Sequence, residues 1–418
     1  MTAEPAILLD VSRLVSRLGS GPLTGIDRVE AEWLAHLQCR PHLLLCRVPR
    51  GQLLLPPRAG AEILRWSRGE GLADLPPPAL LERLRGARDP RARARAALRG
   101  MALARLGRDA GGLARHLRGH PQPASYVNVG HANLLPGLWD NLRDLRRIVL
   151  IHDTIPLDHP EFTRAGQSAK FRARFAAAVG RADLILTISQ ATRDDVLRWR
   201  KTLGLPDAAP VEAVPIGTRL AAASGDPGID THGPFFVTLG TIEPRKNHAL
   251  LLDAWQELGR RLPPDRMPRL YIIGRRGWEN HEVFSRLDRM PADGPVRELA
   301  DLDDGAVAHL LLRSHGLLMP SRAEGFGLPL TEAAGRGIAV LSAPLPAARE
   351  LLGDYARYLS PDAPGDWADA VADLAKGAPQ RSQPLAVRDW PGYFRDIGAR
   401  LGWDCTTDPL GLVPDKTA

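Results

Sequence analysis

The chain has 418 residues, of which 44% are hydrophobic and 25% are charged, and its formal net charge is +7. This composition is typical of a folded globular protein and excludes a chain that is disordered throughout. A length of this order predicts two domains.

The N-terminal stretch and the cysteines indicate a cellular compartment. No apolar run reaches the roughly 18 residues of a membrane-spanning helix. Glu4 stands where a signal peptide has basic residues. The three cysteines, Cys39, Cys46 and Cys405, lack the spacing of a metal site, so we expect reduced thiols. Together these features predict a cytoplasmic protein.

Short apolar segments of strand-forming residues alternate with helical patterns through the first half of the chain. Strands that are apolar throughout and separated by helices indicate a parallel sheet covered on both faces. We therefore predict a doubly wound α/β domain over residues 1–220, with ligands at the carboxyl ends of its strands. The segments are 6–12, 42–48, 124–130, 147–153, 184–189 and 211–217.

A glycine-containing loop follows the first predicted strand. The sequence GSGPLTGIDR contains Gly19, Gly21 and Gly25 and leads into a helix that begins near Ile26. Glycines in such a loop let the backbone approach a ligand ahead of the helix N-terminus. A tight structural turn explains them nearly as well.

Two histidines stand at strand ends in the same domain. His131 follows the segment 124–130, and His152 lies at the end of the next strand. Both are expected to face the ligand-binding edge of the sheet. A single histidine is more often structural, so a functional and a structural interpretation stay open for each. Asp153 either orients His152 or belongs to a turn.

An arginine-rich segment at residues 79–119 has the composition of an insertion in the first domain. It carries eleven arginines from Arg83 to Arg118, against only Asp89 and Asp109. The segment is either a solvated helical face or a cationic surface for anionic lipid headgroups or a phosphorylated substrate. We expect no nucleic-acid partner, because the aromatic side chains that stack on bases are missing there.

The alternation of strands and helices starts again after a linker. Residues 221–233 belong to a stretch rich in Gly, Pro, Ser and Asp. The pattern beyond it predicts a second doubly wound domain over residues 234–385, followed by a C-terminal segment, 386–418, with an amphipathic helix at 388–401. The predicted strands are 235–240, 269–274, 316–321 and 338–343, and the predicted helices are 247–261, 304–314 and one from about 329.

Two glutamates eight positions apart mark a loop in the second domain. In PSRAEGFGLPLTEAAGRG, residues 320–337, Glu324 lies in a glycine loop and Glu332 lies in the first turns of a helix that opens near Pro329. The free backbone N–H groups and the helix dipole suit phosphate, and the carboxylates suit sugar hydroxyls. The loop between them consists of Gly325, Phe326, Gly327 and Leu328.

Two cations stand at the start of another helix. Arg245 and Lys246 follow the strand at 235–240, and Asn247 is a plausible cap. Positive side chains at a helix N-terminus are unfavourable alone, so an anionic ligand is a natural way to offset them, although a solvated basic pair is the simpler alternative. With the glutamate loop, they describe a site for a nucleoside diphosphate. The motif DLD at 301–303 has the spacing of a metal site, but we interpret it as a helix cap.

The segments GTIEPRKN and PSRAEGFGLPLTEAAGRGIAVLSA resemble the C-terminal half of family-4 glycosyltransferases of group 1 type. The resemblance is strong over residues 235–365 and looser through GSGPLTGIDRVEAEWL and IHDTIPLDHPEF. It implies the GT-B fold, in which two Rossmann-like domains face each other across a cleft and the last helix crosses back onto the first domain. Trp390 would then pack on that domain.

The resemblance also implies an activity and roles for the site residues. The activity is a retaining, metal-free transfer of a sugar from a nucleotide-diphosphate donor to a glycan or lipid-linked acceptor, without a cofactor, in polysaccharide biosynthesis. Mannose is the first expectation, from the similarity to bacterial mannosyltransferases, with GDP or UDP as the nucleotide. Peripheral attachment to the inner membrane face would suit such an enzyme. The implied donor contacts are Arg245 and Lys246 to the diphosphate, Glu332 to the ribose, Glu324 to the sugar, and Gly25 with residues 325–328 through the backbone, while His131 or His152 would act on the donor sugar or the acceptor.

Two other classes of function stay open. One is another sugar-nucleotide enzyme of similar architecture, either an epimerase or a phosphorylase, of which the latter would need a lysine-bound pyridoxal phosphate. The other is a binding module that keeps the fold without the chemistry. The presence of Arg245, Lys246, Glu324 and Glu332 together favours an enzyme.

Overall fold

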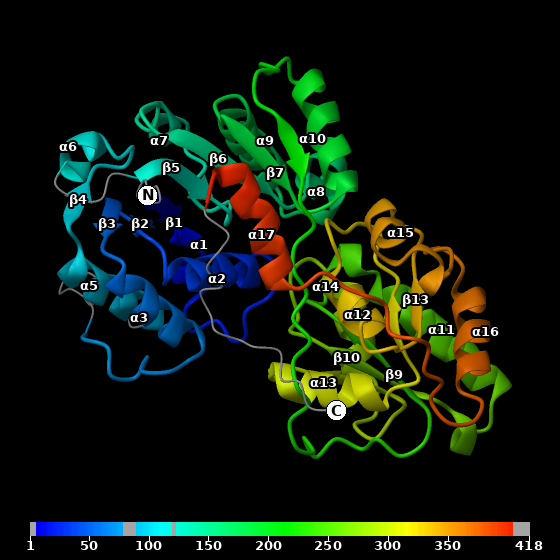
Figure 1. Cartoon of the computed structure of the whole chain (residues 1–418). Coiled ribbons are helices and arrows are strands. Elements are labelled where there is room, and N and C mark those ends of the chain that lie inside the picture. The colour runs from blue at the N-terminus through cyan, green and yellow to red at the C-terminus, as the bar shows by residue number, and fades with distance from the viewer. Residues whose placement is uncertain (1–5, 78–88, 119–122, 404–418) are drawn as a thin grey trace.

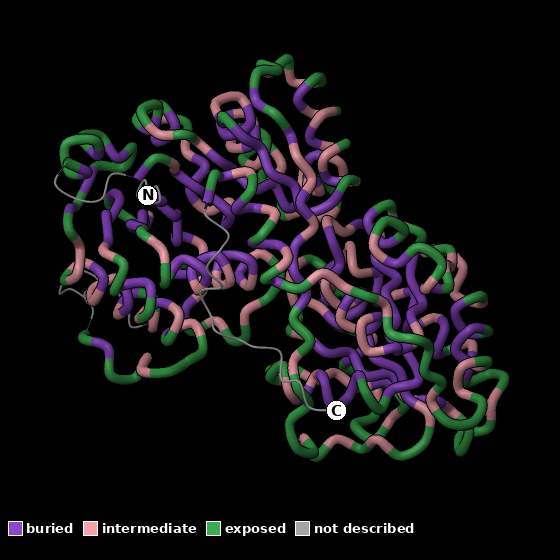
Figure 2. The backbone as a smooth tube through the Cα atoms, in the orientation of Figure 1, coloured by how far each residue is buried: buried purple, intermediate pink, exposed green. Residues whose placement is uncertain are grey.

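The computed structural model describes residues 6–77, 89–118 and 123–403. These residues form two α/β domains, each built around one sheet with helices on both faces (Figure 1). In Figure 2 the strands run through the buried interior of each domain. The expected architecture of two doubly wound domains is confirmed.

The N-terminal domain contains an eight-stranded sheet in the order β4-β3-β2-β1-β5-β6-β7-β8. Its strands are β1 (Ala6–Asp10), β2 (His42–Val48), β3 (Gly51–Leu55), β4 (Ala104–Leu106), β5 (Pro123–Asn128), β6 (Arg146–Ile151), β7 (Leu184–Thr187) and β8 (Val211–Ala213). The covering helices are α1 (Ser12–Arg17), α2 (Ile26–Leu37), α3 (Arg58–Ser67), α5 (Pro90–Met101), α6 (Leu113–Leu117), α7 (Pro136–Asp140), α8 (Ile155–Asp158), the 3₁₀ turn η1 (Pro160–Phe162), α9 (Gln167–Val179) and α10 (Gln190–Thr202).

Successive residues of β1 show why these strands read as continuously apolar. Ile7 and Leu9 belong to the hydrophobic cluster on one face of the sheet, whereas Leu8 belongs to the cluster on the other face. A strand with helices on both sides buries every side chain, so it loses the alternation of a strand with one solvated face.

One edge of this sheet differs from the parallel arrangement predicted from the sequence. β3 runs antiparallel to β2, and β4 runs antiparallel to β3. The prediction omitted both strands. Only Pro49 and Arg50 separate β2 from β3, and a connection this short forces an antiparallel hairpin because a parallel pair needs a long crossover.

The arginine-rich segment is part of the N-terminal domain's core. Ala94 and Leu98 of α5 are buried in one hydrophobic cluster, and Leu106 of β4 is buried in the other. Arg93 donates to the backbone oxygen of Leu75 at 2.9 Å. The exposed arginines among the described residues are Arg91, Arg105, Arg108, Arg115 and Arg118, whereas Arg83, Arg85 and Arg88 lie outside the described residues.

The C-terminal domain has a six-stranded parallel sheet in the order β11-β10-β9-β12-β13-β14. Its strands are β9 (Phe235–Leu239), β10 (Arg269–Ile273), β11 (Val296–Leu299), β12 (Gly316–Met319), β13 (Val340–Ser342) and β14 (Arg357–Tyr358). Its helices are α11 (His248–Arg261), α12 (His281–Asp288), α13 (Asp304–Arg313), α14 (Leu328–Ala334), α15 (Pro346–Leu352) and α16 (Pro364–Leu374), with 3₁₀ turns η2 (Pro244–Lys246), η3 (Pro264–Arg266) and η4 (Gly353–Tyr355).

The last described helix, α17 (Trp390–Leu401), returns to the N-terminal domain, where it lies against α2 (Figure 1). Trp33 of α2 donates its indole N–H to the hydroxyl of Tyr393 at 3.1 Å and meets Phe394 edge to face. Trp390 is buried in the same cluster, as expected. Within the described residues the chain crosses between the domains twice, and the crossings touch, because Thr218 N donates to Arg388 O at 2.7 Å.

Cys39 and Cys46 are free thiols, as expected, and Cys405 lies outside the described residues. No helix in the described part of the chain has both the length and the apolar character needed to cross a bilayer.

Candidate functional site

The carboxyl ends of both sheets meet where the two domains face each other. A β-carbon on Gly325, which follows β12, would lie 2.1 Å from the carbonyl oxygen of His152, which follows β6. Only glycine fits there. Ser189, which follows β7, donates its hydroxyl to the carbonyl oxygen of Gly325 at 3.0 Å. The glycine loop of one domain is therefore held against the strand ends of the other.

Arg245, Lys246 and Glu324 form a compact ionic cluster at this edge, because β9 and β12 are neighbours in the sheet. The Nζ of Lys246 lies 2.6 Å from one oxygen of Glu324, and Nη1 of Arg245 lies 2.9 Å from the other. The Nε of Arg245 lies 2.6 Å from Glu243. The Glu324 side chain is 8% exposed and that of Lys246 is 11% exposed, so these charges are shielded from water.

The cluster holds Glu324 ionised. Burial alone would raise the pKa of Glu324, but the adjacent Lys246 and Arg245 outweigh burial and lower the pKa to about 2. Burial also lowers the pKa of Lys246, partly offset by Glu324. Burial tends to lower the pKa of Arg245, but Glu324, Glu243 and Asp153 raise it overall. Two cations and an ionised carboxylate therefore coexist at the end of the sheet.

The structure revises how the two cations are accommodated. Arg245 and Lys246 lie in the 3₁₀ turn η2, just before α11, and carboxylates of the protein itself are their counter-ions. Asn247 is the N-cap residue of α11, but its side chain donates to the carbonyl oxygens of Pro320 and Pro361 and makes no capping hydrogen bond. The sequence interpretation missed Glu243, which sits two residues before Arg245.

The glycine loop leads directly into α14, and its residues play different parts. Gly327 has φ +95° and is the N-cap residue of α14. The side chain of Phe326 is buried in the hydrophobic cluster of the N-terminal domain, with Leu328 packed beside it. Phe326 therefore anchors the loop to the opposite domain.

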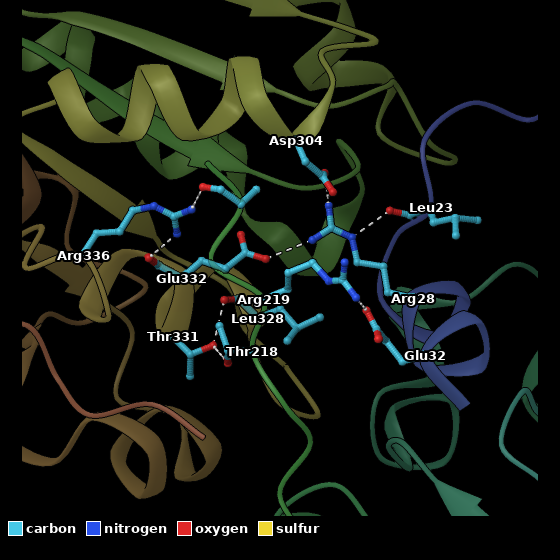
Figure 3. A network of polar contacts seen from close by, with 11 residues as sticks. Leu23, Arg28, Glu32, Thr218, Arg219, Asp304, Leu328, Thr331, Glu332 and Arg336 are labelled. Atoms are coloured by element: carbon cyan, nitrogen blue, oxygen red, sulfur yellow. Dashed lines mark hydrogen bonds and ion pairs between the residues drawn. The ribbon is translucent and has the colours of Figure 1, made fainter. Parts of the chain in front are cut away.

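Glu332 faces the N-terminal domain, where it meets Arg28 of α2 (Figure 3). Nη1 of Arg28 lies 2.9 Å from Glu332, and Nη2 pairs with Asp304 at the start of α13. Burial raises the pKa of Glu332, Arg28 opposes this shift and Asp304 adds to it. A small cavity between the domains is lined by Arg28, Arg219, Ala221, Asp304, Val307, Ala308, Leu311, Glu332 and Arg336.

The two candidate histidines lie side by side, with ring centroids 5.1 Å apart. The Nε2 of His131 is 2.8 Å from the carbonyl oxygen of Leu150, and that of His152 is 2.6 Å from the carbonyl oxygen of Val129. A carbonyl oxygen only accepts, so each Nε2 carries the proton and each Nδ1 carries the lone pair. Burial lowers the pKa of His131 to about 4 and lowers that of His152 as well. Both rings are neutral at pH 7.

The glycine loop of the N-terminal domain also reaches the domain boundary. Gly25 is the N-cap residue of α2 with φ +46°, and a β-carbon there would meet nothing within 4 Å. A β-carbon on Gly21 would collide with the guanidinium of Arg275, which donates to Ser20 O at 2.6 Å. The sequence interpretation singled out these glycines but missed Arg28, although it lies in the same motif, GIDR.

The motif DLD behaves as expected, because the Asp303 side chain caps α13 by accepting from Ala306 N at 2.7 Å. Within the ranges that the structure describes, no group of three or more His, Cys, Asp and Glu side chains is placed to hold a metal ion.

Comparisons with known proteins bear on the same residues. Residues 222–384 match the family described as glycosyl transferases group 1. The serotype-specific mannosyltransferase WbdA of Escherichia coli is 29% identical over 273 residues, which are 60% of this chain and 33% of that protein. The O-antigen chain mannosyltransferase B of E. coli is 26% identical over 232 residues, which are 52% of this chain and 58% of the relative. This chain thus spans one third of the first relative and less than two thirds of the second.

A solved structure shares the complete fold. Anabaena HepE in complex with UDP-glucose superposes with a TM-score of 0.61 over 95% of this chain and 99% of that one, at 15% sequence identity. At this identity the likeness shows the fold alone.

Proposed function

From the premise that this chain has the GT-B fold and that its residues 222–384 are a group 1 glycosyltransferase domain, we propose that it transfers a sugar from a nucleotide-diphosphate donor to a glycan or lipid-linked acceptor. The observation that carries the proposal is the buried cluster of Lys246, Glu324 and Arg245, which lies at the domain boundary opposite Asp153, beside the carbonyl oxygen of His152. Mannose is the proposed sugar, since both relatives described above are mannosyltransferases by name.

Arg245 and Lys246 are proposed to bind the diphosphate. As the bond between the anomeric carbon and the phosphate oxygen breaks, negative charge grows on the departing nucleoside diphosphate. Preorganised cations stabilise that charge most where water is excluded. The role fits two cations fixed by carboxylates, since both are already held in place before the donor arrives. It also supports a reaction that proceeds without a metal.

We propose that the sugar retains its anomeric configuration. Both oxygens of Glu324 already accept charged hydrogen bonds, which makes this carboxylate a poor nucleophile. The acceptor hydroxyl would then attack the anomeric carbon on the face from which the diphosphate leaves. Its proton passes to an oxygen of the departing phosphate, so one C–O bond breaks and one forms.

His131 is proposed as the histidine that contacts the donor sugar. It is partly exposed, whereas His152 is 3% exposed and packs behind it. With its Nε2–H engaged by Leu150 O, neutral His131 offers Nδ1 as an acceptor for a sugar hydroxyl. His152 would fix the orientation of that ring.

The test is donor turnover by purified protein. GDP-mannose and a panel of UDP-sugars are supplied separately, and release of the nucleoside diphosphate is followed with and without a chelator. We expect turnover of one donor, unchanged in the chelator. Loss of all turnover in chelator with recovery on adding Mn²⁺ or Mg²⁺ contradicts the metal-free reaction, and no turnover of any donor favours a binding module.

The diphosphate assignment has its own test in R245A and K246A. Each substitution removes charge-assisted hydrogen bonds worth about 1.5–3 kcal/mol, so the double variant should bind the nucleoside diphosphate at least tenfold more weakly by calorimetry. An affinity within about twofold of the wild type would mean that the diphosphate lies elsewhere.

We also propose that the exposed arginines Arg105, Arg108, Arg115 and Arg118 attract an anionic membrane surface that presents a lipid-linked acceptor. Each arginine near such a surface contributes about 1 kcal/mol, and salt weakens the attraction. Vesicle co-sedimentation should therefore show binding to anionic but not neutral vesicles, lost at high salt and reduced when all four become glutamine. Binding that ignores these changes assigns the membrane contact to another surface.

A further inference from the structure

Arg28 is the residue that joins the N-terminal domain to the carboxylate of Glu332. Its guanidinium donates in three directions: from Nη1 to Glu332 at 2.9 Å, from Nη2 to Asp304, and from Nε to Leu23 O at 2.9 Å. The first two acceptors belong to α14 and α13 of one domain, and the third belongs to the glycine loop of the other (Figure 3). A planar guanidinium held at three points has little freedom to rotate.

The negative charge of Glu332 depends on its contact with Arg28. Its side chain is 12% exposed, and a carboxylate removed from water needs a partner to stay charged. Asp304 shares the same guanidinium, so loss of Arg28 would leave two carboxylates facing each other without their common cation. Arg336, just beyond the end of α14, donates to the backbone oxygens of Glu332 and Ala221, and its charge lowers the pKa of Glu332 less than that of Arg28 does.

Arg28 and Glu332 both line the small cavity between the domains. Nη1 of Arg28 approaches Oε1 of Glu332, whereas no side chain in the described part of the chain donates to Oε2. A ribose presents two neighbouring hydroxyl donors, and an ionised carboxylate accepts both. The chemistry at Glu332 is therefore complete only while Arg28 keeps it charged and fixed.

We propose that Arg28 is a positioning residue for the donor: it keeps the Glu332 carboxylate ionised and oriented for the two ribose hydroxyls of the nucleotide. This inference rests on the proposed function, because it assumes that Glu332 meets a ribose. It adds that the N-terminal domain supports the nucleotide through Arg28 without itself touching the ribose. The affinity for the nucleotide therefore depends, through the guanidinium of Arg28, on how the two domains lie against each other.

The experiment compares two nucleotides that differ only in the ribose. GDP and UDP are first titrated into the full-length wild type by calorimetry, and the tighter one is then compared with its 2′,3′-dideoxy analogue. R28M should weaken binding of the ribonucleotide by about tenfold, a change that corresponds to loss of one charge-assisted contact. It should leave binding of the dideoxy analogue within about twofold, because that ligand lacks the hydroxyls that Glu332 accepts.

Three further variants separate this role from a loss of structure. R28K keeps a cation beside Glu332 and should bind the ribonucleotide with an affinity between those of the wild type and R28M. R181M removes the exposed ion pair between Arg181 and Asp140, which belongs to the same domain as Arg28 and does not border the cavity. It should bind as the wild type does. E332Q should repeat the pattern of R28M, weak for the ribonucleotide and unchanged for the analogue.

Several results would overturn the inference. Equal weakening of both nucleotides by R28M would make Arg28 a direct contact or a purely structural residue, and tighter binding would make it a competitor of the ribose. No change in R28M, or no recovery in R28K, contradicts the positioning role while E332Q still weakens the ribonucleotide. If E332Q changes nothing, or if neither nucleotide binds the wild type, the proposed function has failed instead.

Discussion

Glu324 and Glu332 stand eight residues apart in one motif, and each is paired with an arginine, yet their surroundings differ. Glu324 pairs with Lys246 and Arg245 of its own domain, which lower its pKa to about 2. Glu332 pairs with Arg28 of the facing domain and shares it with Asp304, and burial raises its pKa. One carboxylate is fixed within a domain, whereas the other depends on the contact between domains.

The difference shows that spacing in a motif places two side chains but does not set their chemistry. Glu324 follows β12, and the two cations that pair with it follow the neighbouring strand β9. The folded C-terminal domain alone therefore keeps Glu324 charged. Glu332 lies on α14, facing the boundary, so its charge depends on what the other domain brings. The first glutamate holds two cations of its own domain in place, and the charge of the second depends on the approach of the other domain.

The largest expected effect separates the two glutamates by stability. E324Q leaves Lys246 and Arg245 with less counter-charge in a buried cluster, and breaking such a pair costs about 3–5 kcal/mol. E332Q removes one partner of a pair in which Arg28 is 30% exposed, so its cost should be about 1 kcal/mol or less. Urea unfolding of both variants measures the two values. Equal losses would contradict the distinction between an internal and an interdomain pair.

A smaller effect is expected from the glycine that follows Glu324. In G325A the new methyl group would overlap the carbonyl oxygen of His152, 2.1 Å away. Forcing the loop aside costs about 1–3 kcal/mol and moves Glu324 from its place at the domain boundary. We expect donor turnover to fall much more than stability. G259A is the matched control, because a β-carbon on Gly259, within α11, meets nothing within 4 Å. Full turnover in G325A would mean that the two edges separate during the reaction.

The smallest effect is a difference in how stability depends on pH. The folded-state pKa of Glu324 is depressed, so its contribution is present above the unfolded pKa of about 4.5 and is lost as the pH falls toward about 2. The folded-state pKa of Glu332 is raised, so its ionisation reduces stability as the pH rises above the unfolded value. The difference in unfolding free energy, wild type minus variant, is measured from pH 3 to 7. This difference should increase with pH for E324Q and decrease with pH for E332Q. Parallel slopes would show that the two carboxylates share one environment.

Most of the fold could be predicted because buried parallel strands leave a local signal. The apolar segments at residues 6–12, 42–48 and 235–240 coincide with β1, β2 and β9. β3 was missed because no helix separates it from β2, whereas β4 has only three residues and β14 only two. The helix at 388–401 was identified by its pattern, but its place on the first domain came from family resemblance.

The candidate site was predictable to the level of residues but not of partners. Arg245, Lys246 and Glu324 were singled out from two separate motifs, and the structure brings them within hydrogen-bonding distance. That Glu243 neutralises Arg245, or that Arg28 reaches Glu332 over 304 positions of sequence, could not be predicted. Such contacts depend on how two domains are set against each other, and no local pattern encodes that arrangement.

The return of α17 to the N-terminal domain has a consequence for how the protein is made. Trp33 in α2 finds its partners Tyr393 and Phe394 only after the ribosome has synthesised the whole of the C-terminal domain. Until then the nascent first domain has an uncovered aromatic surface. The C-terminal domain, encoded without interruption, is free to fold before the domain that precedes it is complete. The N-terminal domain is thus the first to be synthesised and the last to be completed.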